Sequence, residues 1–253
     1  MIFKRLIPSL LMDDELLYKT NKFKNSTYIG DVVNAFKIFN DFEVDEISLI
    51  SYRSTISNKK LDFGFLKEVL TEAFMPVSYG GGVKSVSDCE KLFYLGVEKI
   101  IINSAAYYQK NLISSIANEF GSQAITISVD YRKNFLGNRV LYVESGTKKT
   151  EYSAIEFANE SIEKGAGEII FHSIDRDGTF SGLDLDLITK VNLKVPTIFA
   201  GGSSDYLTTK KAFSVSSNLK SISSGSLFVF NGNRESIIIN YPNYEEKKWI
   251  LNI

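Results

Sequence analysis

The sequence contains an internal repeat that spans most of its length. Pro76–Gly82 (PVSYGGG) is echoed by Pro196–Gly202 (PTIFAGG) at an offset of 120 residues. Two further matches keep nearly this spacing, Asp45–Leu49 with Gly167–Phe171 at 122 residues and Ile102–Ser104 with Ser223–Gly225 at 121. A period this long is far beyond that of a solenoid repeat, so the sequence predicts two fused halves of one closed unit, about 1–122 and 123–253.

Composition narrows the class of protein. The 253 residues, of which 44% are hydrophobic, suffice for a sizeable core within a single domain. A net charge of −1 gives no general attraction to nucleic acid or membrane. The start, Met1–Pro8, is too short and too charged for a signal peptide, and no apolar run approaches the roughly 18 residues of a membrane span, so we expect a soluble cytoplasmic protein.

Residues that commonly hold metals are scarce. Cys89 is the only cysteine, which excludes an internal disulfide and any multi-cysteine metal site. His172 is the only histidine, and it falls in a predicted strand, where we interpret it as a structural residue. We therefore expect neither a metal nor a cofactor.

Apolar runs of strand length alternate with stretches of helical periodicity. Strands are predicted at 3–11, 45–51, 76–80, 99–103, 124–130, 168–173, 196–200 and 221–224, and helices at 31–42, 64–73, 85–95, 110–120, 153–164, 184–191, 205–213 and 234–240. Gly96, Gly121 and Gly165 suit helix C-termini, and Ser85 with Asp88 resembles a capping box. Eight βα units predict a (β/α)8 TIM barrel, because an open doubly wound sheet would not explain two matched halves.

In such barrels the chemistry lies on the loops that follow the strands. Two of these loops are long, 12–30 and 131–152, and 139–143 within the second suggests a small hairpin. Glycine-rich turns occur in both halves beside a polar residue of the next strand end, and glycine lets an anion approach exposed backbone N–H groups. The sequence thus predicts two facing phosphate cradles, formed by Gly81, Gly82, Asn103 and Ser104 and by Gly201, Gly202, Ser224 and Gly225.

The two halves differ at one strand end. The fifth predicted strand ends in Asp130, whereas its counterpart in the first strand ends in Leu11. Asp13 is two residues further on, a displacement of about 6–7 Å along a strand, which is too far for a proton that moves across a hydrogen bond of about 3 Å. One acid of a possible general acid/base pair is therefore missing.

Several blocks along the whole chain resemble HisF, the cyclase subunit of imidazole glycerol phosphate synthase. They are Lys4–Pro8, Tyr79–Val83, Ile102–Ala106, Phe120–Gln123 and Ser173–Thr179. The resemblance implies a barrel that receives ammonia from a docked HisH-like glutaminase and adds it to a bisphosphorylated substrate. It also implies that Lys19, Asp177, Gly178 and Thr179 contact the phosphorylated ligand, and that Glu98 lies at the glutaminase interface.

The same resemblance implies an ammonia gate of four charged residues at the opposite face. They are Arg5, Glu46, Lys99 and Glu168, near the starts of strands one, two, four and six. Without the resemblance, charges at strand starts would simply be solvated on the stability face of the barrel.

Two residues depart from the cyclase pattern. The family places catalytic aspartates at the ends of strands one and five, and here these positions hold Leu11 and Asp130. It also usually places an acid at the end of strand two, where this chain has Ser51. The stretch Leu10–Asp14 and the run Lys22–Asp31 resemble more closely the HisF-like WbuZ group, which is linked to sugar amidation for surface polysaccharides.

The leading interpretation is a subunit that activates a glutaminase and passes ammonia onward, with a separate sugar amidotransferase as a possible further partner. One alternative is an authentic cyclase of histidine biosynthesis in which another residue replaces the missing acid. Another is a scaffold that activates the glutaminase and transports nothing. The related aminoimidazole ribotide isomerase also needs paired aspartates, so Leu11 argues against it.

Overall fold

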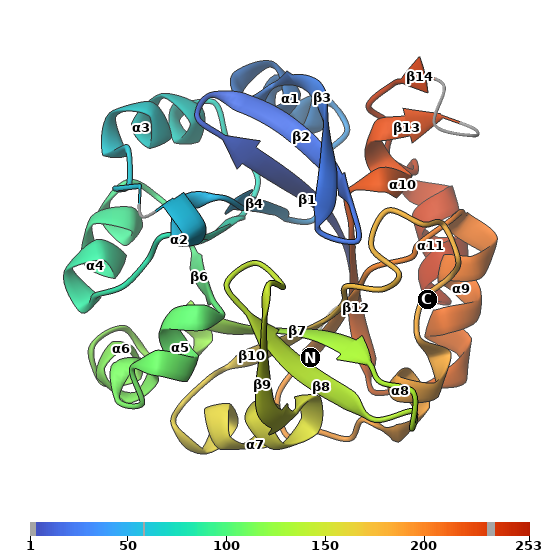
Figure 1. Cartoon of the computed structure of the whole chain (residues 1–253). Coiled ribbons are helices and arrows are strands. Elements are labelled where there is room, and N and C mark those ends of the chain that lie inside the picture. The colour runs from blue at the N-terminus through green and yellow to red at the C-terminus, as the bar shows by residue number, and fades with distance from the viewer. Residues whose placement is uncertain (1–3, 58, 232–235) are drawn as a thin grey trace.

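Eight parallel strands close into a barrel in the computed structural model, which describes residues 4–57, 59–231 and 236–253 (Figure 1). The strands are β1 (Arg5–Asp13), β4 (Ile47–Ser51), β5 (Val77–Gly80), β6 (Lys99–Ile102), β7 (Ile125–Lys133), β10 (Glu168–Ser173), β11 (Thr197–Ala200) and β12 (Leu219–Ser224). Closure comes from the parallel pairing of β1 with β12, which sets Arg5 opposite Ser221. The predicted fold class is confirmed.

Helices surround the barrel and follow the strands in turn (Figure 1). The longer ones are α1 (Val32–Asp41), α3 (Phe63–Thr71), α4 (Val86–Tyr94), α6 (Leu112–Phe120), α7 (Ala154–Glu163), α8 (Leu185–Lys190), α9 (Tyr206–Val215) and α11 (Tyr244–Leu251); short helices are α2 (Ser54–Ser57), α5 (Ser104–Tyr108), α10 (Ser226–Val229) and a 3-10 turn at Ser122–Ala124. The predicted capping box of Ser85 and Asp88 starts α4. Gly96, Gly121 and Gly165 have positive φ at helix ends, as predicted.

The apolar core has two parts because strand residues alternate between the two faces of the sheet. The larger part fills the space between the strands and the helices, and Cys89 lies in it as a fully buried free thiol. The smaller part lies inside the barrel and consists of Ile7, Ile101, Ile170, Ile198 and Ala200. No helix among the described residues is long and apolar enough to cross a bilayer.

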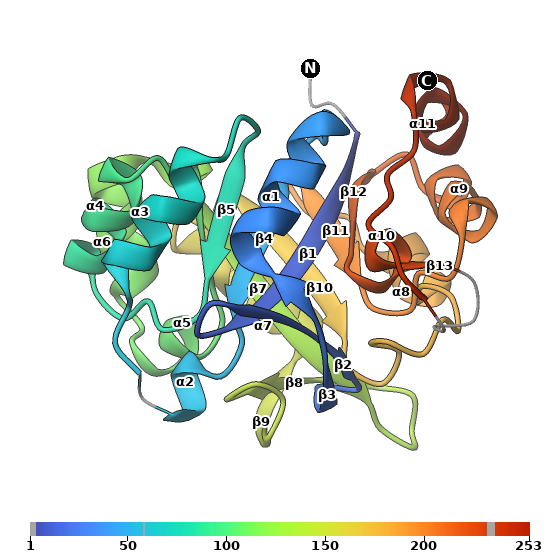
Figure 2. The ribbon, with the colours of Figure 1, turned by 90° about the horizontal axis from the view of Figure 1, so that it is seen from above.

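Two hairpins project from the strand-end face, which is the lower side of Figure 2. The hairpin of β8 (Arg139–Val143) and β9 (Lys148–Ser153) confirms the one predicted at 139–143. The second hairpin is formed by β2 (Leu16–Asn21) and β3 (Lys24–Asp31). It corrects the prediction of a long loop at 12–30, because β1 continues to Asp13 and pairs with β2.

The helix predicted at 234–240 is wrong. Ser236–Ile237 form a short strand, β14, paired with β13 (Phe230–Asn231), while 234 and 235 lie outside the described residues. Three consecutive isoleucines at 237–239 favour an extended backbone, since β-branched side chains are stiff at χ1. The last βα unit is completed instead by α10 and α11.

Candidate functional site

A cavity of about 450 Å³ opens at the strand-end face. Residues of both halves line it, including Leu11, Ile50, Asp130 and His172 at the strand ends. It also reaches Ser48 and Ser128 deeper inside the barrel. The cavity thus combines an apolar wall with a few polar groups, which is typical of small-molecule sites.

Asp130 is a buried acid of this cavity. The residue is 8% exposed, and its carboxylate accepts a hydrogen bond of 2.7 Å from Ser128 Oγ. Burial raises the pKa of Asp130, and the nearby charge of His172 only partly opposes this effect. Asp130 is therefore a proton donor or acceptor with a higher pKa than an ordinary aspartate.

His172 lies between Asp130 and a second acid. It stands opposite Asp130 in the β7–β10 register, and its Nε2 is 3.6 Å from Asp177 Oδ1. Thr20 Oγ1 also donates to Asp177 at 2.8 Å. Burial alone would raise the pKa of Asp177, but His172, Lys19 and Thr20 together hold it below its usual value. From the sequence we interpreted His172 as a structural residue. In the structure it lies in the cavity wall, where it contacts Asp177.

Leu11 lines the same cavity as Asp130, so the broken match of the repeat lies within the site. Neither of the two acids that follow Leu11 closely in the sequence takes its place. Asp13 is ion-paired with Arg53 and Lys59, and Asp14 with Lys59, on the exposed rim. Ser51 is buried and its hydroxyl is bound to that of Ser54. The pair of carboxylates typical of a cyclase is not assembled by these residues.

The second-half cradle is a small polar recess beside the cavity. Gly201, Gly202, Ser224, Gly225 and Gly178 line it together with Lys19 and Asp177. Lys19 is 6% exposed, and burial lowers the pKa of its ammonium group. A Cβ at residue 225 would overlap Lys19 Nζ, so glycine is needed for the lysine to lie there. Thr179 is not among the lining residues; its hydroxyl donates to the Arg176 carbonyl.

The first-half cradle lines the main cavity with Gly81, Gly82, Asn103 and Ser104. Asn103 Nδ2 donates to the carbonyls of Ser128 and Tyr142 at 3.0 and 3.3 Å. Ser104 Oγ donates to Asn103 Oδ1 and accepts from the Glu144 backbone N–H. The predicted residues are brought together, but their side-chain donors already have partners in the protein.

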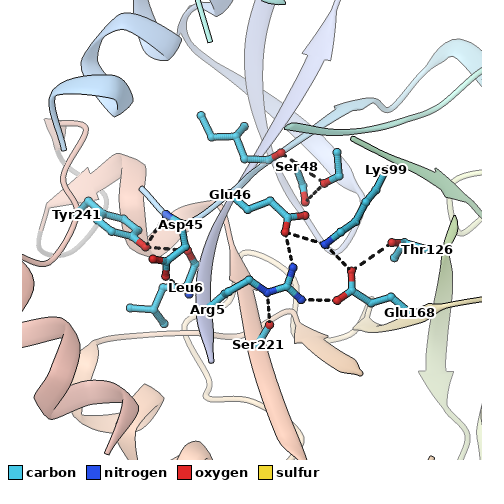
Figure 3. A network of polar contacts seen from close by, with 12 residues as sticks. Arg5, Leu6, Asp45, Glu46, Ser48, Lys99, Thr126, Glu168, Ser221 and Tyr241 are labelled. Atoms are coloured by element: carbon cyan, nitrogen blue, oxygen red, sulfur yellow. Dashed lines mark hydrogen bonds and ion pairs between the residues drawn. The ribbon is translucent and has the colours of Figure 1, made fainter. Parts of the chain in front are cut away.

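At the strand-start face, four charged side chains form a closed ring (Figure 3). Arg5 contacts both Glu46 and Glu168, and Lys99 contacts the same two acids at 2.9 and 3.1 Å. Arg5 Nε also donates to Ser221, and Thr126 donates to Glu168. Burial opposes the charge of Arg5, but Glu168 and Glu46 raise the net pKa of its guanidinium.

The ring blocks the base of the barrel without leaving an unpaired buried charge. Glu46 and Glu168 are only 3% and 5% exposed, and each is paired with two cations. Glu98, adjacent to Lys99, is exposed on the same face. Above the ring, Ser48 is the next inward residue after Glu46 on its strand, and it lines the cavity. The ring and the cavity floor are thus about two strand rises apart.

The structure is a (β/α)8 barrel with a cavity at the strand-end face and a closed ion-pair ring at the strand-start face. The chain belongs to the histidine biosynthesis protein family, whose model matches residues 5–233. More particularly, its relatives are HisF proteins. It is 41% identical over 244 residues to a protein of Pseudomonas aeruginosa named putative imidazole glycerol phosphate synthase subunit hisF2, covering 96% of this chain and 97% of the relative.

Other relatives extend this comparison. The chain is 38% identical over 251 residues, 98% of each chain, to a Leptospira interrogans protein named putative imidazole glycerol phosphate synthase subunit HisF. It is 34% identical over 205 residues to the imidazole glycerol phosphate synthase subunit HisF of Streptococcus mutans, covering 80% and 82% of the two chains. The family expected from the sequence is confirmed.

Glu144 and Tyr52 line the main cavity but were not predicted from the sequence. Glu144 lies in the long loop predicted at 131–152, so position along the chain was the available signal. Ser203, which follows Gly201 and Gly202 in the predicted glycine turn, lines the smaller recess. Among the described residues, neither Ser203 Oγ nor the buried Tyr52 hydroxyl has a hydrogen-bond partner.

Proposed function

We propose that this chain is a HisF-like subunit that docks a HisH-like glutaminase at its strand-start face and passes ammonia through the barrel to an acceptor other than the cyclase substrate. A sugar is the acceptor that the resemblance to the WbuZ group favours. A phosphorylated ligand binds at the mouth, with Lys19 near its phosphate.

The observation that carries this proposal is the combination of an intact ring with an incomplete acid pair. The ring of Arg5, Glu46, Lys99 and Glu168 lies directly below small hydroxyl side chains such as Ser48, which connect it to the cavity. Ammonia is small and neutral, so it needs only a displaced ring member in order to pass. Ring closure of an imidazole, by contrast, would lack the carboxylate at Leu11, and loss of a general acid or base typically costs about 10²–10⁴ in rate.

A second candidate is an authentic cyclase. The HisF names of the relatives favour it, and Asp130 with its raised pKa would supply one acid. The two candidates differ in one assay. Purified protein supplied with the histidine-pathway substrate and ammonium should form no imidazole product at ordinary enzyme rates; if it does, the proposal is wrong.

The conduit itself is testable by isotope dilution. The protein is assembled with its glutaminase, supplied with glutamine labelled with nitrogen-15 at the amide, excess unlabelled ammonium and a cell extract that contains acceptors. A conduit should transfer undiluted label to the amidated product. Lys99→Leu opens the ring and should let unlabelled ammonium mix in, as should Arg5→Ala.

Lys247→Met is the matched control for these ring variants. Lys247 is also a cation of the strand-start face, but its partner at 2.7 Å is Asp45, outside the ring. This variant should transfer label as the wild type does. Full dilution in the wild-type complex would contradict the conduit and favour a scaffold that only activates the glutaminase.

A further inference from the structure

The strand registers make the two halves of the mouth directly comparable. Leu11 pairs with Ile50 as Asp130 pairs with His172, and Gly80 pairs with Ile101 as Ala200 pairs with Ser223. Because Gly80 and Ala200 are counterparts, their partners Ile101 and Ser223 are counterparts too, at an offset of 122 residues. This offset is one more than the sequence comparison gave for β6 and β12. Asn103 therefore corresponds to Gly225. Each residue of one cradle therefore has a counterpart in the other.

The counterparts differ in the groups that bind anions. Ser203 corresponds to Val83, since each directly follows its glycine turn. Leu10 corresponds to Val129, one residue before the Leu11 and Asp130 counterparts. Continuing the antiparallel register by one residue in the first hairpin and by two in the second places Lys19 opposite Leu10 and Val143 opposite Val129, so Lys19 is the counterpart of Val143. Val83 and Val143 are both buried. The first-half cradle thus has valines where the second-half cradle has a buried cation and a buried hydroxyl without a partner.

The rim of the first-half cradle also carries an acid. Glu144 lines the cavity, and Tyr108 OH donates to its Oε1 at 2.5 Å. The backbone N–H of Glu144 is already bound to Ser104 Oγ. Lys84, an exposed lysine, lines the same cavity, and Lys148 pairs with Glu144 on the exposed side of the rim. A phosphate dianion placed here would meet the Glu144 carboxylate, and the side-chain donors of Asn103 and Ser104 already have partners, which is unfavourable.

From these contrasts we propose that the mouth binds a phosphomonoester whose single phosphate lies in the second-half cradle and whose uncharged, hydroxyl-bearing end lies at the first-half cradle. This inference rests on the proposed function of the mouth as the ligand site, and it replaces the expectation of two phosphate cradles. The buried Tyr52 hydroxyl, which lines the cavity without a partner, suits such a neutral polar end.

The test is an NMR titration of the full chain with inorganic phosphate, fructose 6-phosphate and fructose 1,6-bisphosphate. Inorganic phosphate should shift the backbone amides of Gly202, Ser203 and Gly225 and leave those of Gly82 and Ser104 in place. The monophosphate should bind at least as tightly as the bisphosphate. Lys19→Met should weaken both by about tenfold or more, the effect of one charge-assisted hydrogen bond.

Glu144→Gln provides the sharper comparison. It keeps the size of the side chain and removes the charge, so it should tighten bisphosphate binding by roughly tenfold relative to the monophosphate. Glu151→Gln is the matched control, because Glu151 is an exposed acid of the same hairpin that accepts from Tyr107 OH as Glu144 does from Tyr108. This control should change neither affinity.

Two results would overturn the inference while leaving the conduit intact: phosphate shifts of similar size in both cradles, or a wild-type preference of about tenfold for the bisphosphate. Absence of binding by every phosphate compound would overturn both this inference and the mouth as a phosphate site. A failed isotope experiment together with one-cradle phosphate binding would refute the conduit alone.

Discussion

At the scale of single residues, the mouth holds two buried aspartates whose pKa values shift in opposite directions. Burial dominates at Asp130 and raises its pKa, whereas His172, Lys19 and Thr20 outweigh burial at Asp177 and lower its pKa. The environment of each carboxylate, and not its residue type, therefore decides the direction in which its pKa shifts.

This difference predicts opposite pH effects. The folded protein binds the Asp130 proton more tightly than the unfolded chain does, so this residue reduces stability as the pH rises above the unfolded value of about 3.9. Asp130→Asn should therefore raise Tm at pH 7, and the gain should vanish below about pH 4. Scanning calorimetry of the variant and the wild type between about pH 4 and pH 7 measures this difference in Tm.

Asp177→Asn is the comparison, and the sign reverses. A lowered pKa adds stability above the unfolded value and loses it as the pH falls through the folded value. This variant should lower Tm at pH 7, with the deficit shrinking in acid. If Tm changed in the same way with pH in both variants, Asp130 and Asp177 would not differ in environment as their contacts indicate.

Sequence comparison reached only part of this site. The repeat singled out Asp130 and Leu11, because they are equivalent strand ends with different chemistry. It did not reveal that Lys19 crosses to Gly225 or that Ser203 lacks a partner. Those are relations between side chains of different elements, which no local pattern encodes.

At the scale of elements, the two hairpins meet above the cavity. Phe23, in the turn of the β2–β3 hairpin, packs edge-on against His172 with ring centroids 4.8 Å apart. A Cβ at Gly146, in the β8–β9 turn, would lie 2.9 Å from Phe23 Cδ2. The turns of the two hairpins therefore approach each other closely at Phe23, beside His172.

Gly146→Ala should destabilise the protein for two reasons. Its φ of +77° is unfavourable for alanine by about 1–2 kcal/mol, and the new methyl group would displace Phe23. Gly137→Ala is the control, since Gly137 has a φ of +84° but only Lys133 Cε near, at 3.7 Å. Urea unfolding should show a larger loss for Gly146→Ala; equal losses would mean that the two hairpins do not support each other.

The barrel strands were predictable from sequence and the hairpins only in part. Buried parallel strands appear as short apolar runs, so all eight were located. The β2–β3 hairpin was missed because β3 is mostly exposed and polar (KNSTYIGD), without the alternation that marks a half-buried strand. The helix predicted at 234–240 failed because the isoleucines there were assigned helical periodicity despite their extended preference.

At the scale of the whole molecule, the C-terminal segment is fastened to the first strand. Tyr241 OH donates to the Leu6 carbonyl at 2.9 Å and accepts from the Asp45 backbone N–H at 3.3 Å. Lys247 pairs with Asp45, which also accepts from the Leu6 N–H. The two ends of the sequence are thus held together beside the seam between β1 and β12.

Tyr241→Phe tests how much this fastening contributes. The ring stays buried while two hydrogen bonds are lost and two backbone groups are left without this partner, so the free energy of unfolding should fall by about 1–3 kcal/mol. Tyr244→Phe is the control, because Tyr244 is 66% exposed. Denaturant unfolding measures the free energy of unfolding of both variants. If Tyr241→Phe lowers it no more than Tyr244→Phe does, the stability of the seam does not depend on the Tyr241 hydroxyl.

The seam also has a consequence for synthesis on the ribosome. β1 is made well before β12, so one of its edges finds its partner only when β12 emerges more than 200 residues later. Until then a growing chain has an open parallel sheet with a free edge, the kind of surface that invites association with other chains. The segment with Tyr241 and Lys247 follows β12 and contacts Leu6 and Asp45. A chain truncated before this segment would therefore pair β1 with β12 but lack the contacts that stabilise this seam.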